Sequence, residues 1–248
     1  MLTRARGVLN EARRRHGQAE GVKLEILEGA ASRLGGFSLS AYRNANQDDS
    51  RLTTNEALAA SDLVLRELKT VPIHPSLALC ALGRPDLRPS DQKAAGAYYT
   101  DFRLAEYVAR GAGLALHADA QVLDPACGTG ILLVAAAIKV CGPDRYRTAK
   151  WLAGNVVAAD LSSDAIRGAR LALASLTDDL GATREMTLRW KCHDSLLMWS
   201  KSGPTADVTL ANPPWEKVKL SRYELLRGEV GDNIDICSRL QSLHSILC

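Results

Sequence analysis

The chain has 248 residues, 46% of them hydrophobic and 24% charged, and its formal net charge is +3 at pH 7. This length suits one large domain or two small ones, and it is sufficient to bury a core. The small net charge is compatible with nucleic-acid binding and equally with none, so it identifies no class of partner.

Residues 1–93 are predicted to be mostly helical. Thr53 and Glu56 fit a capping box, in which each side chain bonds a backbone N–H at the start of a helix. The apolar positions that follow have helical spacing, and the helix should end before Val71-Pro72, because a residue before proline avoids the helical region. This part of the chain shows no recognisable chemistry.

Two charged segments in this region are open to interpretation. Arginines at 13–15 suit phosphate contacts, but the acidic residues nearby favour a solvated helix face; these are Glu11, Glu20, Glu25 and Glu28. The segment from Gly83 to Asp91 is rich in proline and charge and is the best candidate for a linker.

After residue 94 short apolar strands alternate with amphipathic helices. We expect strands at Val122–Leu123, Val156–Ala159, Met186–Trp190 and Val208–Leu210, with helices over Ile131–Val140 and around Ile166–Leu173. Strands that alternate with helices indicate a parallel sheet with right-handed crossovers. The chain is therefore predicted to be an α/β protein with a helical N-terminal region.

A glycine-rich turn lies between the first of these strands and its helix. Its sequence is Asp124-Pro125-Ala126-Cys127-Gly128-Thr129-Gly130. Glycines let the backbone turn sharply and approach a ligand, and the following helix presents free N–H groups. A turn of this kind occurs in many nucleotide-binding folds, but this particular string is much more specific.

Acidic residues follow the next two predicted strands. Asp160 can accept hydrogen bonds from ribose hydroxyls or can simply precede a helix N-terminus, and its place after the glycine turn favours ribose. Asp194 can accept a hydrogen bond from the exocyclic amine of a cofactor adenine. His193 beside it is not required as a base by the chemistry inferred below.

The fourth strand ends at Asn212-Pro213-Pro214-Trp215, at the sheet edge where α/β proteins bind ligands. Two prolines stiffen the loop and leave carbonyl groups without neighbouring N–H partners. A plain strand terminator with a packed Trp is the alternative. The order of the preceding segments favours a functional loop.

These segments, together with Gly96-Ala97-Tyr98-Tyr99-Thr100, occur in the order seen in gamma-type amino-methyltransferases. Over residues 94–220 the chain resembles the adenine-N6 DNA methyltransferases of restriction–modification systems. The resemblance implies a doubly wound, Rossmann-like methyltransferase fold that binds S-adenosylmethionine, in a catalytic domain over 94–248. The chain departs from the family in having Asp101 after the Thr and a longer span between Gly130 and Asp160.

The resemblance also implies roles for individual residues. The methionine end of the cofactor would lie against Thr100 and the turn from Asp124 to Gly130, the ribose against Asp160 and Leu161, and the adenine against Asp194 and Ser195. Asn212 and the Pro213 carbonyl would accept the two N–H bonds of the target amine. Pro214 would stiffen the loop, and Trp215 would stack on a base flipped out of DNA.

The chain carries no signal for a membrane, a metal or a disulfide framework. No apolar run approaches the roughly 20 residues of a transmembrane helix, and no apolar segment follows the cationic N-terminus. The six cysteines include no Cys-x-x-Cys pair. We expect a cytoplasmic protein with reduced thiols, without a metal or a membrane partner.

Several alternatives remain at this level. Asn-Pro-Pro followed by an aromatic residue also serves methyltransferases that act on protein glutamine or ribosomal RNA, although the Tyr-Tyr-Thr segment favours the DNA group. Only a short stretch follows Trp215, so we expect a truncated catalytic domain or one completed by another, specificity-determining subunit. A cofactor-binding remnant without activity is the alternative from a different class.

Overall fold

The computed structural model describes residues 2–17, 20–48, 50–86, 99–199 and 203–212. They belong to one compact unit, Met1–Pro213, while a second unit, Pro214–Cys248, lies outside the described residues. Five helices form the N-terminal part of the first unit: α1 (Thr3–His16), α2 (Glu20–Gly35), α3 (Leu39–Asn46), α4 (Thr54–Thr70) and α5 (Pro75–Leu82).

The start and end of α4 confirm the sequence prediction. The Thr53 side chain accepts a hydrogen bond from the backbone N–H of Glu56, and the Glu56 carboxylate accepts one from the Thr53 N–H at 2.8 Å. The helix ends at Thr70, immediately before Val71-Pro72. Local capping chemistry thus sets both ends of this helix.

Helix α2 is buried on nearly all sides, packed against α1, α4 and α10. The prediction of a solvated helix face for the arginines at 13–15 relied on nearby acidic residues, but two of these, Glu25 and Glu28, are 1% and 0% exposed. The prediction holds for Arg14 and Arg15, which pair with Glu11 at the surface. The acidic side chains of α2 can be buried because they are bonded by partners in the core.

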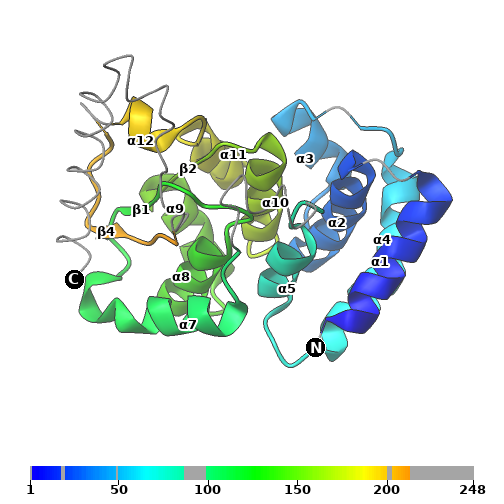
Figure 1. Ribbon diagram of the computed structural model, residues 1–248, viewed down its shortest axis with the longest axis horizontal. Helices are drawn as coiled ribbons and strands as arrows, with labels where there is room; N and C mark the ends of the chain where they lie inside the picture. Colours follow the sequence, from blue (N-terminus) through cyan, green and yellow to red (C-terminus); the bar gives the residue numbers. More distant parts are fainter. Residues whose placement is uncertain (1, 18–19, 49, 87–98, 200–202, 213–248) are drawn as a thin grey trace, which may run out of the picture. The chain divides into compact units, whose positions relative to one another are not determined.

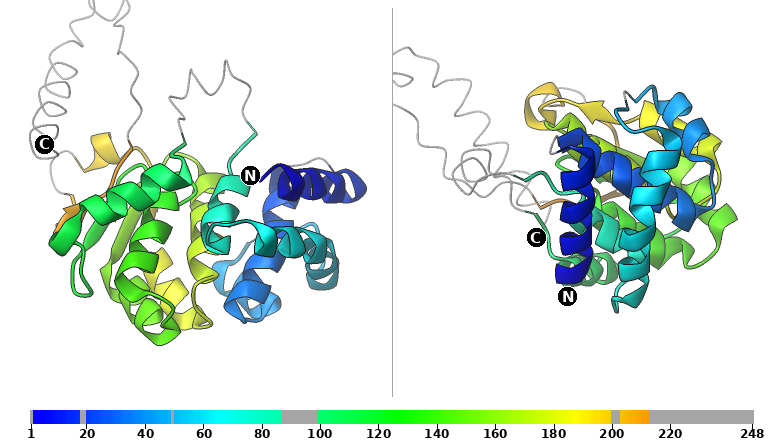
Figure 2. Two further views of the ribbon diagram at one scale, coloured as in Figure 1. Left: turned by 90° about the horizontal axis from the view of Figure 1, so that it is seen from below. Right: turned by 90° about the vertical axis from the view of Figure 1, so that its right-hand side faces the viewer.

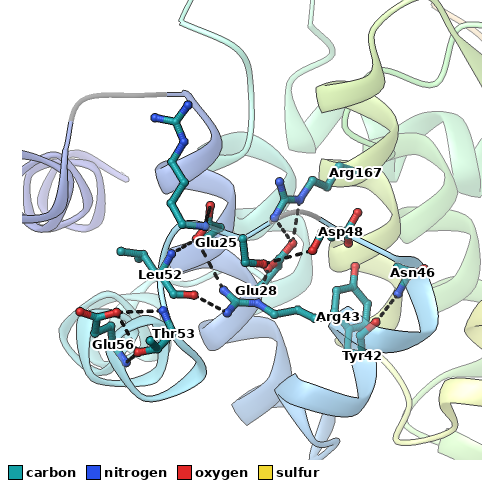
Figure 3. Close-up of polar contacts among 12 residues, drawn as sticks. Glu25, Glu28, Tyr42, Arg43, Asn46, Asp48, Leu52, Thr53, Glu56 and Arg167 are labelled. Atoms are coloured by element: carbon teal, nitrogen blue, oxygen red, sulfur yellow. Dashed lines mark hydrogen bonds and ion pairs between the residues drawn. The ribbon is translucent and has the colours of Figure 1, made fainter.

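Those partners form a network of charged side chains (Figure 3). Glu28 accepts hydrogen bonds from Nε of Arg43 in α3 at 3.2 Å and from Nε of Arg167 at 2.7 Å. Glu25 accepts the backbone N–H groups of Arg51 and Leu52. Burial raises the pKa of Glu28, although both arginines act to lower it. The N-terminal helices are therefore joined through charges to the helix that holds Arg167.

That helix belongs to the α/β part of the chain, whose sheet is small and entirely parallel. Its strands are β1 (Val122–Asp124), β2 (Val156–Asp160), β3 (Lys191–Cys192) and β4 (Val208–Thr209), in the order β3-β2-β1-β4. The described helices of this part are α7 (Phe102–Gly111), η1 (Gly113–Ala115), α8 (Ile131–Cys141), α9 (Arg145–Asn155), α10 (Ser163–Ala174), α11 (Leu180–Leu188) and α12 (Ser195–Met198). This is the predicted α/β alternation, and its strand order is that of one half of a doubly wound sheet plus the first strand across the switch point.

One predicted strand was wrong. Most of Met186–Trp190 lies in or at the end of α11, and the third strand is the shorter β3 that follows it. Met186 and Trp190 are buried whereas Leu188 is 69% exposed, so the apparent alternation of large residues does not correspond to one face of a strand. The Asp179 side chain begins the helix by accepting the N–H of Ala182.

Helices α5 and α10 lie between the remaining N-terminal helices and the sheet (Figures 1 and 2). The beginning of the predicted linker continues from α5 and is fixed rather than free. Lys23 donates to the carbonyl of Arg84 at 2.6 Å, and Asp86 pairs with Arg13. Arg13 is only 11% exposed, so it too departs from the predicted solvated face.

Candidate active site

The glycine turn after β1 has the backbone conformation that its glycines permit. Gly128 and Gly130 have positive φ angles of 52° and 78°. A Cβ atom on Gly130 would lie 2.8 Å from Cβ of Ala169 in α10. Gly130 therefore allows both the turn and the close approach of two helices.

Polar contacts hold this turn between β2 and α5. The backbone N–H of Cys127 donates to the carbonyl of Ala159 at 2.9 Å. The buried Thr129 hydroxyl donates to the carbonyl of Cys80 near the end of α5 at 2.8 Å. The turn is thus supported by the N-terminal helices as well as by the sheet.

Asp124 ends β1 with its carboxyl group buried beneath the turn. The residue is 1% exposed, and its carboxylate accepts the backbone N–H of Ala126 at 3.2 Å. Burial, with a smaller contribution from the charge of Asp160, raises the pKa of Asp124 to about 8. A buried carboxyl group with a raised pKa favours a cationic ligand, because the positive charge of the ligand would stabilise the ionised carboxylate.

Asp160 is bonded to the same turn. Its two carboxylate oxygens accept the backbone N–H of Gly128 at 2.7 Å and of Ser162 at 2.9 Å. The second bond lies before α10, whose N-cap is Ser162, so the Ser162 side chain and not Asp160 caps the helix by accepting the N–H of Ala165. A carboxylate offers about four acceptor positions, so these bonds leave capacity for hydroxyl groups of a ligand. Leu161 beside it is 71% exposed.

Asp194 and Ser195 follow β3 at the start of α12. The Ser195 hydroxyl donates to the carbonyl of Pro125 at 2.6 Å, which joins α12 to the glycine turn. Asp194 is partly buried. His193 packs edge-on against Trp199, with 5.2 Å between ring centroids, so packing accounts for its position.

Asn212 and Thr100 meet beside the turn. Nδ2 of Asn212 donates to Oγ1 of Thr100 at 3.0 Å, and Thr100 is only 7% exposed. Three predicted site residues, Pro213, Pro214 and Trp215, lie outside the described part of the chain.

One pocket brings half of the described site residues together. Its lining includes Thr100, Asp124, Ala126, Cys127, Gly128 and Asn212. It lies where β1 and β4 end, the point at which the strand order reverses and α/β sheets bind ligands.

The other predicted residues do not line this pocket, although two of them are bonded to its turn. These are Asp160, through Gly128, and Ser195, through Pro125. Their positions next to the pocket suit a ligand that extends beyond it. The ligand-binding and catalytic roles assigned to all of the site residues remain predictions.

The sequence analysis missed Arg84, which also lines the pocket. Its Nη2 donates to the backbone carbonyl of Thr100, and its guanidinium carbon lies 5.4 Å from the ring centroid of Tyr99. No motif marks this arginine, because it follows α5 in the helical region where no chemistry was recognised. Only the packing of α5 against the turn reveals it.

The described residues include no group of three or more His, Cys, Asp or Glu side chains that could hold a metal ion. None of their helices is long and apolar enough to cross a membrane.

Comparison with protein families matches residues 86–227 to the family described as N-6 DNA Methylase. The match spans more than half of the chain and includes the glycine turn, Asp160, Asp194 and Asn212. No curated protein and no solved structure matches the chain.

Proposed function

The chain belongs to the N-6 DNA methylase family, and we propose that it transfers a methyl group from S-adenosylmethionine to N6 of adenine in DNA. The observation that best supports this proposal is the Asn212–Thr100 bond at the mouth of a pocket that also contains Asp124. We place the protein in the gamma-type group, in a restriction–modification or related defence system. DNA is the substrate class that the family implies.

The described residues fit S-adenosylmethionine. The positive φ angle at Gly128 leaves its backbone exposed to a ligand without strain. Asp124 supplies a buried carboxyl group whose ionised form a cationic methionine end would stabilise, and Asp160 retains acceptor capacity for ribose. Leu161 would then lie toward the ribose, and Asp194 and Ser195 toward the adenine. When bound, the cofactor supplies a methyl group that the adjacent sulfonium makes electrophilic.

Asn212 is the residue that would prepare the target amine. The nitrogen of an adenine amine is a poor nucleophile because its lone pair is delocalised into the ring. The Asn212 and Pro213 carbonyl groups would accept hydrogen bonds from the two N–H groups of the amine. These bonds would pyramidalise the nitrogen and direct its lone pair toward the methyl group. Such a reaction needs positioning and electrostatics rather than a covalent enzyme intermediate.

The bond to Thr100 supports this role because it uses the amide nitrogen of Asn212 as the donor. It fixes which end of the amide faces Thr100, so the carbonyl end is directed elsewhere. The target adenine would have to leave the duplex, and we assign its stacking to Trp215 on the loop stiffened by Pro214.

Asn212→Ala tests the proposal. Transfer of labelled methyl groups to adenine-containing DNA should be abolished, while calorimetric titration should show binding of S-adenosylmethionine close to that of the wild type. Arg33→Ala, at an exposed pair with Asp62, is the control for both measurements. Unchanged turnover in Asn212→Ala would remove Asn212 from the reaction. Methylation of RNA or of a protein, with none of DNA, would replace the proposed substrate.

A further inference from the structure

The proposed function assigns no role to the guanidinium group of Arg84. It follows Gly83, the C-cap of α5, and lines the pocket together with Asp124 and Thr100. This arginine belongs to the N-terminal helical part, whereas the other residues named in the site come from the α/β part. Its position therefore makes the N-terminal part a wall of the cofactor pocket.

The guanidinium of Arg84 is only partly satisfied by the protein. Nη2 donates to the Thr100 carbonyl, and the group stacks near Tyr99, but Nε is buried with no hydrogen-bond partner among the described residues. Within the described ranges no carboxylate forms an ion pair with it. Burial lowers the pKa of Arg84, as expected for a cation that lacks a close counter-ion.

Buried charges hold Arg84 in this place. Lys23, which is 2% exposed, donates to the Arg84 carbonyl at 2.6 Å and pairs with Asp86 at 3.4 Å. Asp86 pairs in addition with Arg13 of α1. Two cations from α1 and α2 thus fix the backbone on which the guanidinium is carried, and the fixed cation is well placed for an anionic ligand.

Among its described lining residues the pocket contains one half-buried cation, Arg84, and one buried carboxyl group, Asp124. This pair complements a ligand end that itself carries one negative and one positive group. The amino-acid end of S-adenosylmethionine has this character, with an α-carboxylate and an α-ammonium. An arginine fork also matches a carboxylate in geometry better than it matches any other group of this ligand.

We propose that Arg84 binds the α-carboxylate of S-adenosylmethionine, with Asp124 as the acceptor for the α-ammonium group. The inference rests on the proposed function, because it assigns a further residue to the same cofactor site. It gives the N-terminal helices a direct part in cofactor recognition.

The test compares three ligands by calorimetric titration of the full chain. S-adenosylmethionine carries the carboxylate, decarboxylated S-adenosylmethionine lacks it but keeps the amine and the sulfonium, and 5′-methylthioadenosine lacks the whole amino-acid end. The wild type should prefer S-adenosylmethionine over its decarboxylated form by about tenfold or more, as expected for a charge-assisted hydrogen bond. Equal affinity for these two ligands overturns the proposal without any variant.

Arg84→Met should reduce that preference to about one while leaving the affinity for 5′-methylthioadenosine near the wild-type value. Arg84→Lys, which keeps the charge without the fork, should retain part of the preference. Arg33→Met is the control, because Arg33 is an exposed arginine of α2 outside the pocket lining. Thermal unfolding of each variant shows whether it is folded.

The outcomes separate this inference from the proposed function. If the wild type binds S-adenosylmethionine and Arg84→Met weakens all three ligands equally, Arg84 merely supports the Thr100 loop and the carboxylate assignment is wrong. If Arg84→Met retains the full preference, the assignment is also wrong. If the folded wild type does not bind S-adenosylmethionine at all, the proposed function fails, and this inference fails with it.

Discussion

Asn212 and Thr100 are 112 positions apart in the chain, and the 3.0 Å bond from Nδ2 to Oγ1 joins them at the pocket. Thr100 also accepts a hydrogen bond from Arg84 through its backbone carbonyl. A single buried threonine thus connects the end of β4 to the segment that follows α5. The position of the proposed catalytic amide depends on residues from three distant parts of the chain.

Thr100→Val should lower kcat because it removes the acceptor that orients the Asn212 amide. We expect a loss of about tenfold or more, since catalysis of this kind depends on correct positioning. Thr100→Ser keeps the hydroxyl and should retain most activity. Steady-state methylation kinetics with saturating cofactor measure the effect. A normal kcat in Thr100→Val would show that the bond does not position Asn212.

Asp124 should make the free protein less stable as the pH rises. Its pKa is raised from 3.8 to about 8, so the folded protein keeps a proton that the unfolded chain has lost between these values. Stability from this group is therefore greatest below pH 4 and declines up to about pH 8. Asp124→Asn should remove this dependence.

Urea unfolding at pH 5, 7 and 9 without ligand measures the difference. At pH 9 the Asn variant should be more stable than the wild type, by an amount on the order of a few kcal/mol, and its advantage should shrink toward pH 5. Parallel pH profiles for the two proteins would mean that Asp124 is solvated or already paired in solution.

Gly130→Ala should destabilise the fold by about 2–4 kcal/mol, because it combines a left-handed backbone with a collision against Ala169. Gly7 provides the matched control. It is an exposed helical glycine of α1 with no atom within 4 Å of an added Cβ, so Gly7→Ala should be neutral or stabilising by up to about 1 kcal/mol. Chemical denaturation compares the two. Equal effects would contradict the close contact between the turn and α10.

Glu28→Ala should cost about 3–5 kcal/mol, because it leaves Arg43 and Arg167 buried without their carboxylate. Arg33→Ala removes half of an exposed pair with Asp62 and should cost no more than about 1 kcal/mol. The free energy of unfolding in urea distinguishes them. A small effect at Glu28 would indicate that water reaches the network.

The sequence was sufficient for features that local chemistry controls. The Thr53–Glu56 box set the start of α4, and the apolar runs before Asp124, Asp160 and Asn212 identified β1, β2 and β4. The glycine turn was recognised because its sequence is specific. These signals lie within short segments, and each has a direct backbone cause.

Features that depend on packing between distant segments could not be predicted in this way. Met186 and Trp190 are buried four positions apart at a helical spacing, which resembles a strand pattern when Leu188 is counted with them. The burial of Glu28 could not be predicted, because its partner Arg167 lies 139 positions away. Arg84 was missed for the same reason, since only the folded chain places it at the pocket.

The charges shared by Glu28, Arg43 and Arg167 also limit how this protein can be recombined with its relatives. Glu28 and Arg43 come from the N-terminal helices and Arg167 from α10. Each part alone would therefore lack a charged partner that the other part supplies. A chimera that exchanged residues 1–86 for the equivalent part of another methylase would leave Arg167 buried beside foreign residues. Exchange should succeed only between parents that carry the acid and the α10 arginine together.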